Sequence, residues 1–284
     1  MDIQGPHLGA QEFDRACAFA KEYDKDTLIT PCMGPHATET VSPAYLKKII
    51  KVAFDNNMLI HMHVAQTASE YQYIRKKYSC SPVKYLLNAG AFKGKFMGAH
   101  CIYLNRDDIH IMAREGAAIS VTPSSEIVFE RLPPLKNMIA SGVNLVLGTD
   151  CVVAAESMSP LHEMKKMYYA LLQQYGRHYP ITPIQILEMF TINAARALGL
   201  EARIGSIEKN KLADLVILDA RHPSFIPAYD VVANTVLCAH DSMVEKVIVN
   251  GKVIFEDNHP VAVDETEVVL TAENCCRRVS ARAI

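Results

Sequence analysis

Residues 58–67 read MLIHMHVAQT, and this stretch decides the fold that we predict for the chain. Its apolar start, sharp alternation and polar end are typical of a buried strand that stops at a loop. Side chains alternate along a strand with a period of two, so we expect His61 and His63 on the same side, with Gln66 just beyond. In α/β proteins, functional sites are built at strand ends of this kind.

Two further stretches resemble this one, because each is an apolar run that ends on a side chain able to bind a metal. Residues 96–101 read FMGAHC and lead to His100, and residues 143–150 read VNLVLGTD and lead to Asp150. A single histidine on a strand is more often a packing residue than a ligand. Three strands that deliver His63, His100 and Asp150 to one edge of a sheet indicate most of a metal site.

Strands and helices are expected to alternate through the first two thirds of the chain. Ser42-Pro43, Ser159-Pro160 and Thr182-Pro183 each combine an N-cap residue with proline at the first helical position. The last of these is expected to open one continuous helix that ends at Gly199. The strands are expected to begin at Leu28, Met58, Lys95, Ala118 and Val143. This alternation predicts a parallel sheet with helical crossovers.

The texture of the sequence changes after residue 204. Short β-rich runs are expected to form strands over residues 212–218, 231–238, 244–249 and 252–255. The Asn250-Gly251 pair between the last two is a strong hairpin signal. The last twenty residues are expected to form a surface helix. We therefore divide the chain into an α/β part, residues 1–204, and a small β part, residues 205–284.

Composition limits the possible classes of function. Half of the 284 residues are hydrophobic, the net charge is −2, and no apolar run approaches the roughly 20 residues that a membrane span needs. Nucleic acid and membranes are therefore not expected as partners. The eight cysteines contain no CxxC pair, and the first residues lack the pattern of a signal peptide. We expect reduced cysteines and a cytoplasmic location.

Several motifs, in order along the chain, resemble the amidohydrolase superfamily. They are similar to the branch that contains the 5′-methylthioadenosine/S-adenosylhomocysteine deaminases and the triazine hydrolases. The motifs are GPHA at 34–37, HVAQT at 63–67, GAHC at 98–101, GTD at 148–150, TINAARALG at 191–199 and ADLV at 213–216. Single pieces such as GTD are common, whereas the ordered set covers nearly the whole chain.

The resemblance implies a fold and a chemistry. The fold would be α/β, a partial TIM-type (β/α)8 barrel that comprises strands 4 to 8 with their helices, followed by a small C-terminal β-sandwich portion. One divalent metal, zinc in the first place and iron as the alternative, would activate a water molecule. The substrate would be a small purine- or triazine-like heterocycle, hydrolysed at a C–N bond or a ring substituent.

The resemblance also implies a role for each candidate residue. His63 and Asp150 would bind the metal, and Asp150 would take a proton from the attacking water. His100 would contact the metal, the water or the substrate. His36 would line the substrate pocket. Gln66 would orient water or substrate, while His61 would be a neighbour of the site and not a ligand.

The sequence departs from the family pattern at three points. The family's first strand carries an HxH pair that binds the metal, and this chain has no equivalent, so it is expected to begin after the third strand. Gln66 stands where deaminases carry a proton-shuttling glutamate. Glu126 stands where an asparagine is expected, and we interpret it as a solvated loop charge. The alternative hypothesis is therefore an inactive remnant, or a partial barrel that needs a complementing chain or a second copy to cover its strand edges.

Overall fold

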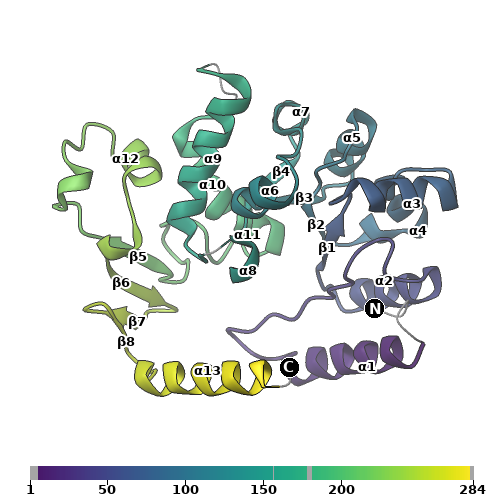
Figure 1. Ribbon diagram of the computed structural model, residues 1–284, viewed down its shortest axis with the longest axis horizontal. Coiled ribbons are helices and arrows are strands. Elements are labelled where there is room, and N and C mark those ends of the chain that lie inside the picture. Colours follow the sequence, from purple (N-terminus) through teal and green to yellow (C-terminus); the bar gives the residue numbers. More distant parts are fainter. Residues whose placement is uncertain (1–5, 156, 178–180, 282–284) are drawn as a thin grey trace.

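A parallel sheet forms the centre of the larger part of the chain (Figure 1). The computed structural model describes residues 6–155, 157–177 and 181–281. The sheet has the order β1-β2-β3-β4, with all neighbours parallel. Its strands are β1 (Ile60–Val64), β2 (Phe96–His100), β3 (Ala118–Val121) and β4 (Asn144–Leu147). The predicted α/β architecture with helical crossovers is confirmed, and the carboxyl ends of all four strands meet at one edge.

Helices connect these strands and cover the sheet. Serine and proline start α2, α4 and α9 as N-cap and first helical residue, and this arrangement supplies acceptors for their free N–H groups. The helices of this part are α1 (Pro6–Glu22), α2 (Pro43–Asp55), α3 (Ala68–Tyr78), α4 (Pro82–Ala89), α5 (Arg106–Arg114), α6 (Pro123–Phe129), α7 (Leu135–Ser141), α8 (Val152–Ala155), α9 (Pro160–Tyr175), α10 (Pro183–Phe190) and α11 (Ile192–Leu198). Among the described helices, none has the length and apolar character that a membrane crossing requires.

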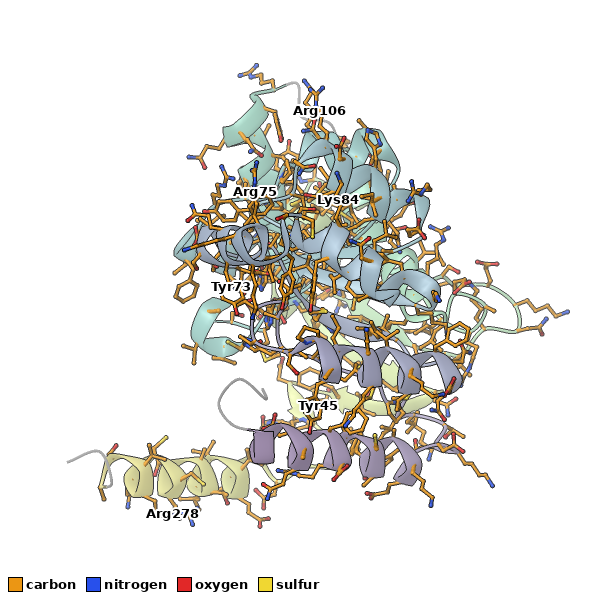
Figure 2. The ribbon with its side chains drawn as sticks, turned by 90° about the vertical axis from the view of Figure 1, so that its right-hand side faces the viewer. Tyr45, Tyr73, Arg75, Lys84, Arg106 and Arg278 are labelled. Carbon is orange, nitrogen blue, oxygen red and sulfur yellow. The ribbon has the colours of Figure 1, made fainter. Side chains whose placement is uncertain are left out.

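The two faces of the sheet are packed differently. One face joins the main hydrophobic core, which includes Ile119 of β3, Met112 of α5 and Leu171 of α9. The other face carries a small apolar cluster, Leu59, Met97, Ala118 and Val146, against which two alanines of α11 pack. In Figure 2 α1 lies beneath α2, and Tyr45 of α2 contacts Phe13 of α1 edge to face.

The strand predicted to begin at Leu28 does not form. Within the described residues this segment makes only isolated parallel bridges to β1, at Met33 and Ala37. The main-chain N–H groups of His61 and His63 donate to the carbonyls of Met33 and His36. Pro31 and Pro35 lack N–H donors, so a continuous ladder cannot form across this segment. The segment nevertheless lies alongside β1 and brings His36 to the end of the sheet.

The single helix predicted over residues 182–198 is two helices, α10 and α11. Thr191 interrupts it with φ −118° and ψ −100°, and its hydroxyl donates to the carbonyl of Leu187. The break turns α11 toward β4, where Asn193 donates to the carbonyl of Leu145 and accepts, through its own carbonyl, from Asn144. These bonds satisfy polar groups at the outer edge of the parallel sheet.

The C-terminal part is a four-stranded antiparallel sheet in the order β5-β6-β7-β8. Asn250 and Gly251 both have positive φ, as a type I′ hairpin turn requires, so that prediction is confirmed. The strand predicted over 231–238 is wrong, because these residues form α12 (Val231–Leu237), which the Asp230 carboxylate caps. The exposed helix α13 (Glu265–Ser280) ends the described chain. The strands are β5 (Leu215–Leu218), β6 (Val244–Val249), β7 (Lys252–Glu256) and β8 (His259–Pro260).

Candidate active site

A pocket of about 500 Å³ lies at the carboxyl edge of the parallel sheet. It is built from the ends of all four strands and from the segment that runs beside β1. Among the predicted site residues, His36, His63, His100 and Asp150 line it. The other lining residues are Gly34, Pro35, His61, Met62, Ala99, Ser120, Thr122, Gly148 and Thr149.

His63 is held by the neighbouring backbone. Its ring Nδ1 lies 2.6 Å from the carbonyl oxygen of His36, and since a carbonyl can only accept, Nδ1 carries the proton. Burial lowers the pKa of His63, and the hydrogen bond to His36 only partly opposes this effect. A neutral ring protonated on Nδ1 leaves the Nε2 lone pair free, which is the arrangement that histidine metal ligands usually adopt.

His100 ends β2 in a backbone conformation that is rare for residues with a side chain. Its φ is +67°, and Cys101 follows with φ +55°. Such conformations cost about 1–3 kcal/mol each and persist only where the surrounding structure enforces them. The ring is buried and nearly parallel to that of His63, with centroids 5.4 Å apart. The strained turn thus places two imidazoles face to face.

Asp150 follows β4 and also has positive φ, +58°. Its Oδ2 lies 3.9 Å from Nε2 of His100, and its Oδ1 accepts from the N–H of Cys151. Burial raises the pKa of Asp150, but hydrogen bonds from Ser125 and Cys151 and the nearby histidines outweigh this effect, so the net pKa is below its ordinary value. The carboxylate is therefore ionised at neutral pH and able to bind a cation or accept a proton.

Glu126 is buried, which corrects the prediction of a solvated loop charge. Its side chain is 1% exposed, and Oε1 accepts from the N–H of Thr122 at 2.9 Å. Burial raises the pKa of Glu126, against the opposing effect of His100 and Thr122. The sequence did contain a signal: a proline and an acidic residue in the same first turn, here Pro123 and Glu126, are typical of a helix start, and α6 begins there.

The start of α6 is tied to α9 by buried polar groups. The carboxylate of Glu163, 1% exposed, accepts from the N–H of Ser124 at 3.0 Å and from its hydroxyl. Lys166 donates to the same hydroxyl at 2.6 Å. Sequence reasoning missed this cluster, because its members lie about forty residues apart and only the packing of α6 on α9 joins them.

Of the remaining candidate residues, His36 and His61 line the pocket and Gln66 does not. His36 bonds through Nδ1 to the Thr40 hydroxyl at 3.0 Å. His61 lies beside His63 on β1, and burial, followed by the charges of His63 and His100, lowers its pKa. Gln66 is not among the described residues that line the pocket. Its N–H donates to the buried carboxylate of Glu70, which holds the turn after β1.

The chemistry of this donor set fits a divalent ion such as zinc, with two imidazole nitrogens and one carboxylate. His63 and His100 both use Nδ1 for bonds to neighbouring residues, His36 and Thr122, which leaves Nε2 of each ring for other contacts. In the part of the chain that the structure describes, however, no three His, Cys, Asp or Glu side chains lie close enough together to hold an ion. The residue types suit a metal ion, but the three side chains do not converge on a common point at which an ion could bind.

Comparison with known proteins gives consistent matches. The model of the amidohydrolase family matches residues 4–254. A 5-methylthioadenosine/S-adenosylhomocysteine deaminase of Desulforudis audaxviator is 35% identical over 254 residues, which are 88% of this chain and 59% of the relative. One of Pelotomaculum thermopropionicum is 32% identical over 279 residues, 97% of this chain and 64% of the relative. The chain thus spans about three fifths of the length of these relatives.

Solved structures share the fold. An adenosine deaminase from Xanthomonas campestris with bound zinc superposes with a TM-score of 0.91 at 26% identity, over 95% of this chain and 62% of that chain. An atrazine chlorohydrolase from Arthrobacter aurescens TC1 complexed with zinc gives a TM-score of 0.83 at 18% identity, over 92% and 58%. The second likeness concerns the fold alone.

Proposed function

Because the chain belongs to the amidohydrolase family, we propose that it contributes the active site of a metal-dependent hydrolase of small heterocycles. The observation that carries this proposal is the convergence of His63, His100 and Asp150 on one pocket at the ends of parallel strands. The reaction would cleave a C–N bond or a ring substituent of a purine- or triazine-like compound. A cytoplasmic location is part of the proposal.

The fold supports a partial-barrel interpretation. We infer that residues 1–204 correspond to strands 4 to 8 of a (β/α)8 barrel with their helices, and that residues 205–284 correspond to part of a small β-sandwich. The irregular segment that bridges to β1 would take the place of the fourth strand. The superposition on the adenosine deaminase over 95% of this chain supports this correspondence.

We propose His63 and Asp150 as ligands of one divalent ion, zinc in the first place and iron as the alternative, with His100 as a third ligand or a contact to water. The bound ion would lower the pKa of a water molecule toward neutrality. The zinc named with the adenosine deaminase supports this choice.

The protein groups would handle the protons and the substrate. Asp150 is poised to accept a proton from the attacking water, because its lowered pKa keeps it ionised. His36, beside His63 with ring centroids 4.9 Å apart, would contact the heterocycle. We propose that Gln66 orients water or substrate. A glutamine cannot shuttle a proton. The proposal therefore includes, besides deamination, the hydrolytic displacement of a ring substituent that needs no acid at this position.

The alternative function is a non-catalytic remnant, or a partial barrel completed by a partner chain or a second copy. Two observations favour it. The described residues contain no group of three close metal-binding side chains, and the chain spans about three fifths of its relatives. In that case purified protein would hold no metal until the partner is added.

Metal content tests the proposal directly. Purified protein is analysed by plasma emission spectrometry as wild type, as His63→Ala and as His110→Ala, the last a control on the exposed face of α5. About one equivalent of zinc or iron in wild type and control, lost in His63→Ala, supports the site. Metal-free, folded wild type contradicts it. Loaded protein is then assayed for ammonia release from 5′-methylthioadenosine, S-adenosylhomocysteine and adenosine and for chloride release from atrazine, with Asp150→Asn as the inactive control.

A further inference from the structure

We infer that Glu126 and Thr122 act as positioning residues that hold the proton of His100 on Nδ1, so that its Nε2 enters the pocket as an acceptor. The functional consequence of this inference rests on the proposed function, whereas the hydrogen-bond geometry from which it is drawn does not. The three side chains form one chain of contacts that runs from a buried carboxylate to the wall of the pocket.

The direction of this chain follows from the hydroxyl of Thr122. The hydroxyl has one proton, and it lies 3.4 Å from Oε1 of Glu126 and 3.0 Å from Nδ1 of His100. The carboxylate oxygen can only accept in this arrangement, because it already accepts from the N–H of Thr122 at 2.9 Å. With the hydroxyl donating to Glu126, its lone pairs are left to accept from Nδ1 of His100, and Oε1 of Glu126 itself lies 3.7 Å from the same nitrogen.

The same direction holds whether or not Glu126 is protonated. A proton on the carboxyl would sit on Oε2, since Oε1 faces the N–H of Thr122. Oε2 is buried and has no hydrogen-bond partner among the described residues. Both states leave Oε1 as the acceptor, so the tautomer of His100 depends on geometry and not on the charge of Glu126.

The chain of contacts is rigid because each member is buried and anchored. The side chains of His100, Thr122 and Glu126 are at most 5% exposed. Glu126 belongs to α6, and the buried carboxylate of Glu163 holds the first turn of that helix through Ser124. The hydrogen bond that one ring nitrogen makes sets which nitrogen carries the proton, and buried, anchored partners keep that bond in place.

The consequence for function is a restriction on what His100 can do. With its proton on Nδ1 the ring presents the Nε2 lone pair to the pocket, and Nε2 lies 3.9 Å from Oδ2 of Asp150. It can bind a metal or accept a hydrogen bond from water or from an amino group of a heterocycle. In this tautomer its Nε2 cannot donate a hydrogen bond to a ring nitrogen. The pocket is therefore selective for ligands that present a donor or a cation at this point.

The test is the tautomer of His100 in the 284-residue chain, measured by two-bond ¹H–¹⁵N correlation spectra of ¹⁵N-histidine-labelled protein at pH 8. The His100 signals are assigned by their loss in His100→Gln. Spectra are recorded before and after chelation, because a metal on Nε2 would itself hold the proton on Nδ1. After chelation we expect the wild type to keep the Nδ1–H pattern. We expect Thr122→Val to lose it and Thr122→Ser, which retains the hydroxyl, to keep it.

A second pair of variants tests the other link. In Glu126→Leu the hydroxyl of Thr122 is free to donate to Nδ1 of His100. We therefore expect the ¹⁵N chemical shift that is typical of an unprotonated ring nitrogen to be found at Nδ1 and no longer at Nε2. Glu126→Gln keeps a carbonyl acceptor and should keep the wild-type pattern. A chelated wild type with its proton on Nε2 overturns the inference, and this measurement needs no variant. An Nδ1–H pattern in protein that binds no metal supports the inference while contradicting the metal site.

Discussion

Replacing Glu163 with alanine should destabilise the protein and disturb the pocket, although Glu163 does not line it. The carboxylate accepts from the buried N–H and hydroxyl of Ser124 at the first turn of α6. Removal leaves the N–H without an acceptor, which costs about 1–3 kcal/mol for a buried group. The hydroxyl keeps Lys166 as a partner. The loss of the hydrogen bond from the Ser124 hydroxyl to the Glu163 carboxylate adds about 1 kcal/mol. We therefore expect the free energy of unfolding to fall by about 2–4 kcal/mol in total.

The free energy of unfolding is measured by urea denaturation of wild type, Glu163→Ala, Glu163→Gln and Glu201→Ala, the last a control for loss of an exposed carboxylate. Glutamine keeps a carbonyl acceptor for Ser124, so we expect it to recover more than half of the loss. The turn that Glu163 holds also contains Ser125, which bonds to Asp150. Metal content should therefore fall in the alanine variant. An alanine variant within about 0.5 kcal/mol of the wild type, the scatter expected of surface changes, would refute this reasoning.

Three further predictions concern stability. The pKa of His61 is lowered in the folded protein, so as the pH falls His61 is protonated in the unfolded chain before it is protonated in the folded one. Stability should therefore fall as the pH drops below about 6.5, the ordinary pKa of histidine. In His61→Asn, urea midpoints should fall less steeply between pH 7 and pH 5. Gly205→Ala places a Cβ 2.7 Å from that of Ala195 at φ +91°, and thermal unfolding should show a loss of about 2 kcal/mol or more. Gly148→Ala places a Cβ 3.0 Å from Oγ of Ser120, and we expect a cost of about 1–3 kcal/mol in urea together with lower metal content.

Local patterns predicted much of this protein correctly. Ser42-Pro43 and Ser159-Pro160 start helices, and Asn250-Gly251 forms a hairpin turn, because caps and turns depend on a few adjacent residues. The four regular parallel strands are near their predicted positions. Where local preference was ambiguous the prediction was wrong, as for residues 231–238, whose valines suggest a strand but whose Asp230 cap starts a helix.

The sequence by itself determined the order of the four parallel strands and the residues that follow their ends, since both depend on periodicity along the chain. The common carboxyl edge of the sheet then brings His63, His100 and Asp150 to one pocket. Only the tertiary structure decided the setting of these groups. The burial of Glu126, the anchor from Glu163 and the strained turn at His100 depend on contacts between segments far apart in sequence, and no local pattern encodes such contacts.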